Sequence, residues 1–243
     1  MYIHKIIMCI DLNKEDRIAF HRSYKSIEDI EKFKYLSADI KNTFKNVHFS
    51  SHSVPTEDDY YMSVVEYDPF FEGVRFYEDI EEFKTKVDNA LEIIPQDILD
   101  YILLKEGPKT NLALQKLIYF IYEDYFKVSD NPLFETKFEA WPHGPVIDDL
   151  YHSLKEYGYC KEIEIVPLEK RRLYLKLSMI ENKDLVVKTS EGILKKLRGY
   201  SAKQLENLSH KKGTPWDITY NDKGKNKGKK IMEPEDIKEY ARS

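Results

Sequence analysis

The chain has 243 residues, of which 42% are hydrophobic and 13% aromatic, so it can form a folded core and is not a disordered tail. Its two cysteines exclude a disulfide framework, and no segment reaches the roughly 18 consecutive apolar residues of a membrane span. The net charge of −5 argues against general nucleic-acid binding, and we expect a cytoplasmic protein without membrane association.

Charge is divided unevenly along the chain. Residues 1–94 contain 12 Lys and Arg against 19 Asp and Glu, a net of −7, whereas residues 95–243 contain 26 against 24, a net of +2. This asymmetry and the helix-starting signal at Pro95 predict two domains, an N-terminal segment over 1–94 and a second domain over 95–243.

The first 94 residues have the mixed pattern of an α+β segment. Apolar spacing, β-branched residues and turn residues predict strands over 2–10, 60–67 and 74–77, with helices over 26–44 and 79–94. The turn sequence DPFFEG between the second and third strands predicts a hairpin, and HFSSHSVP predicts a loop.

From Pro95 onward the signals are mainly helical. The predicted elements in chain order are a helix near 98–103, a helix over 114–125, a loop with Trp141, a helix from Pro145 to Gly158, a hairpin of strands 161–166 and 173–177, a helix from Ser201 to Leu208 and a last helix from Pro234. Ser201 and Gln204 form a capping-box pattern. The lysine-rich stretch 221–230 predicts a loop.

Four sequence pieces in this second part resemble one known family. These are Leu114-Gln115-Lys116-Leu117-Ile118-Tyr119-Phe120, then Phe138-Glu139-Ala140-Trp141-Pro142-His143-Gly144-Pro145-Val146 after Pro132-Leu133-Phe134, then Leu150-Tyr151 with Tyr157-Gly158, and finally Leu208-Ser209-His210 with Pro215-Trp216. In this order they resemble the Panacea domain of SocA-like antitoxins and phage-associated proteins, over about 97–220. His143 stands where that family often has another residue, and residues 1–94 lie outside the resemblance.

The resemblance implies a fold class and a function. The fold is expected to be α+β, a mainly α-helical Panacea domain with a small β-hairpin behind an acidic α+β segment. The function is expected to be that of an antitoxin, which neutralises a toxin encoded by an adjacent gene through direct protein–protein binding. Two alternatives stay open: an adaptor that delivers a bound protein to a cytosolic protease, and a phage or plasmid inhibitor of a host factor.

Most residues of the resemblance have a structural explanation. Trp141 is expected to pack over the helix start at Gly144-Pro145, and Lys116 to extend to solvent or to pair with Glu139. The scaffold set is Leu114, Gln115, Lys116, Leu117, Tyr119, Phe120, Trp141, Gly144, Pro145, Val146, Tyr151, His210, Pro215 and Trp216. A second interpretation places Trp141, His143 and Trp216 around a groove that binds the toxin, because aromatic residues are frequent interface hot spots.

A second partner-binding candidate lies in the acidic N-terminal part. Over 57–82 many carboxylates alternate with aromatic residues, so this face could complement a basic toxin. The candidate contact residues are Tyr60, Tyr61, Phe70 and Phe71.

Catalysis, metals and cofactors are not indicated. His143 and His152 with Asp148 and Asp149 form no recognised nucleophile–base signature, and Cys160 has none. His48 and His52 have a metal-like spacing, but Ser and Pro surround them. We expect no enzyme, no metal and no cofactor. Operator DNA at the loop 221–230 is an unfavoured partner, since no aromatic residues alternate with its lysines.

Overall fold

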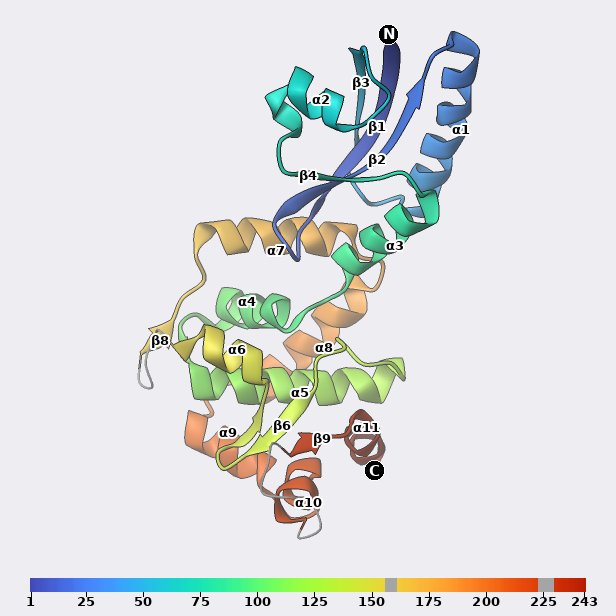
Figure 1. The fold of residues 1–243 in the computed structure, drawn as a ribbon. Helices are drawn as coiled ribbons and strands as arrows, with labels where there is room; N and C mark the ends of the chain where they lie inside the picture. The colour runs from blue at the N-terminus through green and yellow to red at the C-terminus, as the bar shows by residue number, and fades with distance from the viewer. Residues whose placement is uncertain (156–160, 223–229) are drawn as a thin grey trace. The chain divides into compact units, whose positions relative to one another are not determined.

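The computed structural model describes residues 1–155, 161–222 and 230–243. Contacts divide the chain into two compact units (Figure 1). Unit 1 comprises Met1–Glu92 and Leu175–Glu181, and unit 2 comprises Ile93–Tyr174 and Asn182–Ser243. The division after Glu92 falls close to the expected boundary at Pro95, but residues 175–181 group with unit 1.

Unit 1 is a four-stranded sheet with helices packed on it. Its elements are β1 (Tyr2–Asp11), β2 (Asp16–Tyr24), α1 (Ile27–Thr43), β3 (Ser50–Thr56), α2 (Met62–Tyr67), the short 3₁₀ helix η1 (Pro69–Phe71), β4 (Val74–Tyr77) and α3 (Ile80–Leu91). The strand order is β3-β1-β2-β4, antiparallel except where β4 runs parallel to β2.

Both faces of this sheet are buried. Successive residues of a strand point to opposite faces, so alternate residues of β1 join two different apolar clusters. Ile7 and Cys9 of β1 join an apolar cluster with residues of α1 and α3 such as Phe33 and Phe83. Ile6 and Met8 of the same strand join a second cluster that includes Val64 of α2 and Phe71 of η1. The sheet is therefore the centre of a three-layer unit.

Several predictions for this part are confirmed. The strand over 2–10, the strand over 74–77 and the two long helices are present. Ser26 and Asp79 cap α1 and α3, each accepting a bond from a first-turn backbone N–H.

Other predictions for unit 1 are wrong. Residues 62–67 form the helix α2, although the β-branched and aromatic content of 60–67 favoured a strand. Consequently β4 pairs with β2 and makes no hairpin across DPFFEG. The predicted loop HFSSHSVP contains β3, because Ser50–Thr56 pairs along β1 and that tertiary pairing overrides weak local propensity.

Unit 2 is mainly helical. Its elements are α4 (Pro95–Glu106), β5 (Lys109–Thr110), α5 (Asn111–Ser129), β6 (Phe138–Trp141), β7 (Gly144–Val146), α6 (Asp148–Ser153), β8 (Glu162–Ile163), the first part of α7 (Pro167–Met179), α8 (Lys183–Lys196), α9 (Ala202–Ser209), α10 (Pro215–Asn221), β9 (Ile231–Met232) and α11 (Pro234–Arg242). The small sheets pair β5 with β8, and β6 with both β7 and β9.

Helix α5 is the central element of unit 2. It lies between α4 on one side and β6, α9 and α11 on the other (Figure 1). Because it is enclosed, most of its residues are buried, including the polar side chains of Asn111, Gln115 and Lys116. A helix that is buried nearly all round does not show a one-sided apolar pattern.

The α+β class with a small hairpin is confirmed, but the hairpin is at a different place. Strands β6 and β7 form it over residues 138–146, where a loop with Trp141 and a helix start at Pro145 were predicted. The predicted strand 173–177 is wrong, because these residues lie in α7. Its alternating sequence LYLKL favoured a strand, yet Leu173 and Leu177 are also spaced for one helix face.

Gly158, Cys160 and the stretch 223–229 lie outside the described residues.

The capping box of Ser201 and Gln204 and the last helix from Pro234 are confirmed. Helix α8 was not predicted, although Val186, Ile193 and Leu194 have helical spacing, and it packs along α5.

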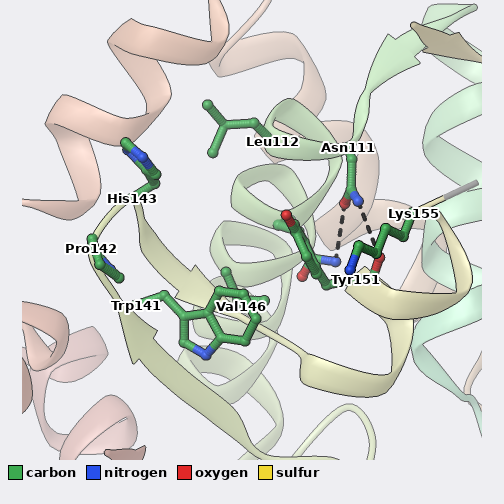
Figure 2. Close-up of a pocket in the computed structure, with 9 residues that line it drawn as sticks. Asn111, Leu112, Trp141, Pro142, His143, Val146, Tyr151 and Lys155 are labelled. Atoms are coloured by element: carbon green, nitrogen blue, oxygen red, sulfur yellow. Dashed lines mark hydrogen bonds between the residues drawn. The ribbon is translucent and has the colours of Figure 1, made fainter. Parts of the chain in front are cut away.

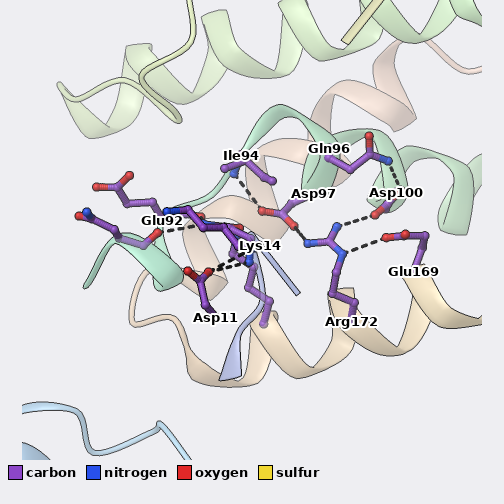
Figure 3. Close-up of polar contacts among 12 residues, drawn as sticks. Asp11, Lys14, Glu92, Ile94, Gln96, Asp97, Asp100, Glu169 and Arg172 are labelled. Atoms are coloured by element: carbon purple, nitrogen blue, oxygen red, sulfur yellow. Dashed lines mark hydrogen bonds and ion pairs between the residues drawn. The ribbon is translucent and has the colours of Figure 1, made fainter. Parts of the chain in front are cut away.

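A group of buried charges joins α4 to the start of α7 within unit 2. The guanidinium of Arg172 donates to Asp97 and Asp100, both at 2.7 Å, and to Glu169 at 2.9 Å (Figure 3). Arg172, Asp97 and Asp100 are buried, so these charges depend on one another for compensation.

Candidate functional site

The pieces of the resemblance meet on one side of α5. The hairpin β6–β7 lies against α5 and α9, and α10 lies against β6. The hairpin, α5 and the end of α6 border a cavity of about 300 Å³ (Figure 2). The lining residues are Asn111, Leu112, Gln115, Trp141, Pro142, His143, Val146, Tyr151 and Lys155.

Three polar residues of α5 hold the segment that follows the hairpin turn. The side-chain oxygen of Gln115 accepts from the Ile147 N–H at 3.0 Å, and Lys116 Nζ donates to the Pro145 carbonyl at 2.6 Å. One turn earlier, Asn111 Nδ2 donates to the Tyr151 carbonyl at 3.2 Å. These bonds satisfy buried backbone groups of β7 and α6 and fix the wall of the cavity.

Lys116 therefore has a different role from the expected one. It is fully buried and so does not extend to solvent, and its Nζ donates to the Pro145 carbonyl. The Glu139 carboxylate instead accepts from Trp141 Nε1 at 2.8 Å. Burial lowers the pKa of Lys116 to about 7, and the charge of Glu206 opposes part of this shift. A cation that titrates near neutrality thus holds β7 in place.

Gly144 is required by this packing. Its φ of +101° lies in a region that L side chains rarely adopt. A Cβ there would lie 2.7 Å from Ser209 Oγ and 2.8 Å from Lys116 Cε. The hairpin approaches α5 and α9 this closely only because residue 144 has no side chain.

Trp141 forms one wall of the cavity. It ends β6, is partly buried, and its ring centroid lies 5.0 Å from that of Tyr151 on α6. Figure 2 shows Trp141, Pro142 and His143 following one another on one side of the cavity, with Asn111, Tyr151 and Lys155 on the other. The His143 side chain is largely exposed, and its Nδ1 lies 3.5 Å from Glu206.

Trp216 lies behind the hairpin and is only 6% exposed. Its indole N–H donates to the Trp141 carbonyl at 2.8 Å. Its ring stacks on His210, with centroids 3.6 Å apart, and on Tyr220. Pro215 begins α10 behind the capping residue Thr214. This late motif thus supports the hairpin from behind.

The remaining motif residues are part of the core around α5. Leu114, Leu117 and Tyr119 are buried, whereas Phe120 is partly exposed. Val146 is buried and also borders the cavity.

The four aromatic candidates of unit 1 differ in exposure. Tyr60 and Phe70 are exposed, Tyr61 is partly buried, and Phe71 is buried in the core. They lie in the segment of α2 and η1, and unit 2 contains none of them.

Three lining residues were not identified from the sequence. Asn111 lies one helical turn before Gln115, so the i, i+4 spacing could have indicated it. Leu112 and Lys155 carry no local signal, because they reach the cavity only through the packing of α5 and the end of α6.

The other candidate chemical groups lie apart. His143 meets Glu206, while His152 Nε2 lies 3.2 Å from Asp148. His52 is on β3, beside the ring of Phe70. Within residues 1–155, 161–222 and 230–243, no three His, Cys, Asp or Glu side chains converge as metal ligands. No helix of that described part has the length and apolarity to span a bilayer.

Comparison with known proteins gives two matches. The family model described as "Antitoxin SocA-like, Panacea domain" matches residues 114–217, from α5 to α10. "Antitoxin SocA" of Caulobacter vibrioides (strain NA1000 / CB15N) is 33% identical over 133 residues, which cover 54% of this chain and 70% of that protein. No solved structure matches the chain.

Proposed function

This chain belongs to the family of SocA-like antitoxins with a Panacea domain, and we propose that it neutralises a cognate protein toxin by binding it directly. The toxin is the product of an adjacent gene and shares the cytoplasm with this chain. In our proposal residues 95–243 form the antitoxin domain, and residues 1–94 form a separate domain.

The observation that carries this proposal is the cavity beside Trp141. Its volume of about 300 Å³ lies at the lower end of the usual range for ligand sites, and its lining is mainly apolar. A large apolar side chain of a partner can enter it and cover the exposed part of the indole. Partly exposed tryptophans in such recesses are the common hot spots of protein interfaces.

The polar contacts of the site support preorganised binding. Gln115 and Lys116 fix β7, and Trp216 fixes the carbonyl of Trp141, so the walls are set before a partner arrives. Preorganised walls reduce the conformational entropy lost on association. In this proposal Trp141 and His143 belong to the contact surface, and Trp216 supports it from behind.

The first experiment is co-expression of the chain with the toxic reading frame beside its gene. Growth is expected to be restored, and the two proteins are expected to co-purify. If the chain restores growth while no complex forms at any protein concentration, direct binding is the wrong mechanism.

A matched pair of variants tests the cavity. Leu112→Arg places a cation across the cavity, whereas Leu168→Arg makes the same change at an exposed position of α7. We expect L112R to weaken toxin binding by about tenfold or more, a typical loss at an interface hot spot, and L168R to bind normally. Equal binding by the two variants at equal thermal stability would place the interface elsewhere.

We further propose that neutralisation is stoichiometric and involves no catalysis. His143 and His152 meet different carboxylates, which fits two surface pairs better than one acid–base site. Folded single alanine variants of His143, His152, Asp148 and Cys160 are expected to neutralise the toxin in proportion to their binding. A variant that binds normally but no longer neutralises would indicate an enzymatic step.

A further inference from the structure

Helix α2 of unit 1 borders a cleft at the end of β3. Val64 of this helix faces the apolar core and is fully buried. Ser63, Glu66 and Tyr67 share another face, because they are three and four residues apart. Together with Met1, with Pro55 and Thr56 at the end of β3, and with Glu57 and Asp58 after it, they line a cleft of about 510 Å³.

The walls of this cleft are held by a buried hydrogen-bond network. The fully buried His4 of β1 has its Nε2 at 2.8 Å from both the Asp58 carbonyl and Thr56 Oγ1. The hydroxyls of Thr56 and Ser63 are 2.8 Å apart, which connects β3 to α2. Since the Asp58 carbonyl only accepts, Nε2 carries the proton of His4.

The second nitrogen of His4 then accepts from His21. His4 Nδ1 lies 2.8 Å from Nε2 of His21, which is also buried. Burial lowers the pKa of His21 to about 4, with smaller contributions from His4 and Arg22, so His21 is neutral at physiological pH. The cleft is thus preorganised by polar contacts that join β1, β2, β3 and α2.

The charged side chains that line the cleft are all carboxylates, and the positive group at the cleft is the α-amino group of Met1. Between Lys45 and Arg75 there is no Lys or Arg, and Glu57, Asp58 and Glu66 line the cleft itself. The carboxylate of Asp58 accepts from the Tyr60 N–H at 3.1 Å. Glu57 lies 3.3 Å from the amino group of Met1, but both groups are exposed, and such a pair exchanges readily with another cation.

Apolar exposure accompanies this negative charge. Tyr67 in the cleft is 64% exposed. Tyr60, whose carbonyl accepts from Ser63 Oγ at 2.7 Å, is also exposed. An exposed aromatic face beside carboxylates suits a guanidinium or ammonium group, which uses the ring and the charge together.

We propose that this cleft, lined by Thr56, Glu57, Asp58, Ser63, Glu66 and Tyr67, binds an arginine or lysine side chain of a basic segment in a protein partner. The carboxylates of Glu57 and Glu66 attract the cation, and the ring of Tyr67 covers its stem. Tyr60 contacts the neighbouring residues of the segment. This surface belongs to unit 1, so its role does not depend on toxin binding at the cavity of unit 2.

The test is the binding of labelled peptides to the full chain, measured by fluorescence anisotropy. The probes are oligo-arginine, oligo-lysine and oligo-glutamate peptides of equal length. The variant Glu57→Gln with Glu66→Gln is compared with Glu31→Gln plus Glu81→Gln, which removes the same charge from α1 and α3. We expect the cleft variant to bind the basic peptides about tenfold more weakly and the control less than about twofold more weakly.

Tyrosine variants provide a second, charge-independent comparison. Tyr67→Ser is expected to weaken binding several-fold, while Tyr35→Ser on α1, at a residue that is 79% exposed, leaves it unchanged. Equal losses in the two charge variants, or equal binding of oligo-glutamate, would overturn the proposal. Displacement of the peptide by free spermidine at equal charge concentration would assign the cleft to small polyamines instead.

Discussion

Among the described residues of unit 2, two cations are buried, Arg172 and Lys116, and they are compensated in opposite ways. Arg172 meets three carboxylates at 2.7–2.9 Å, whereas the contact of Lys116 Nζ is a backbone carbonyl at 2.6 Å. Arg172 stays charged throughout the physiological range, while burial brings the pKa of Lys116 to about 7.

The difference separates two roles of buried charge. The Arg172 group fixes α4 against the start of α7 and lies away from the cavity. Lys116 fixes β7 through the Pro145 carbonyl, and Val146 of this strand borders the cavity. We therefore expect the protonation state of Lys116 to affect the proposed binding surface. Stability and binding should therefore respond differently to changes at the two sites.

Removal of unit 1 is the largest change, and it tests whether the buried environments of Arg172 and Lys116 both form within unit 2 alone. Limited proteolysis is expected to cut near residues 90–95 and to leave a resistant C-terminal fragment, identified by mass spectrometry. Its melting temperature should be lower than that of the chain, because residues 175–181 lose their partners in unit 1. An insoluble fragment, or a single transition without resistant species, would show that the chain is one cooperative unit.

Arg172→Met is expected to have the largest effect of any single substitution here. It removes the guanidinium that contacts the buried Asp97 and Asp100, and breaking such a group costs about 3–5 kcal/mol. Urea denaturation measures this loss, and Arg171→Met at the neighbouring exposed position should change stability by less than about 0.5 kcal/mol. Adding Asp100→Leu should recover part of the loss, and its failure to do so would contradict the charge explanation.

Gly144→Ala disturbs the environment of Lys116 directly. The positive φ alone costs about 1–3 kcal/mol, and the contacts with Ser209 and Lys116 add to it. Gly199→Ala is the control, because Gly199 has a similar φ of +81° but no atom near an added Cβ. We expect a greater loss of stability and of toxin binding for G144A, and equal melting temperatures would exclude the steric argument.

Lys116→Met removes a pH dependence. The pKa of Lys116 is about 7 in the folded chain, whereas the ordinary pKa of a lysine is 10.5. Between these two pH values the folded chain therefore binds fewer protons than the unfolded chain. Stability therefore rises with pH across this window, by up to about 1.4 kcal/mol per pH unit. Urea denaturation at a series of pH values should show a flatter profile for K116M, while Lys127→Met, at an exposed residue of the same helix, should keep the original slope.

The sequence predicted elements whose local signals agree with their surroundings. Ser201 caps α9 as expected, since capping depends on neighbouring residues alone, and Ser26 and Asp79 cap the predicted helices α1 and α3 in the same way. The errors at 60–67 and 173–177 arose where β-branched or alternating residues favoured strands, while helical burial of Val64 and Leu173 determined the structure.

The site was predicted only in part for the same reason. Trp141 and His143 belong to a recognisable motif, and both line the cavity. The bond from Lys116 to the Pro145 carbonyl joins residues 29 positions apart. Neither spacing nor composition encodes such a contact.

The close approach at Gly144 also has an evolutionary consequence. A side chain at 144 would collide with both Lys116 Cε and Ser209 Oγ, so the three positions share one limited volume. A larger residue at 144 becomes tolerable only after 116 or 209 has become smaller, and that order of changes matters. Among relatives of this chain, substitutions at these three positions should therefore occur together, although they lie on three different elements and more than twenty residues apart.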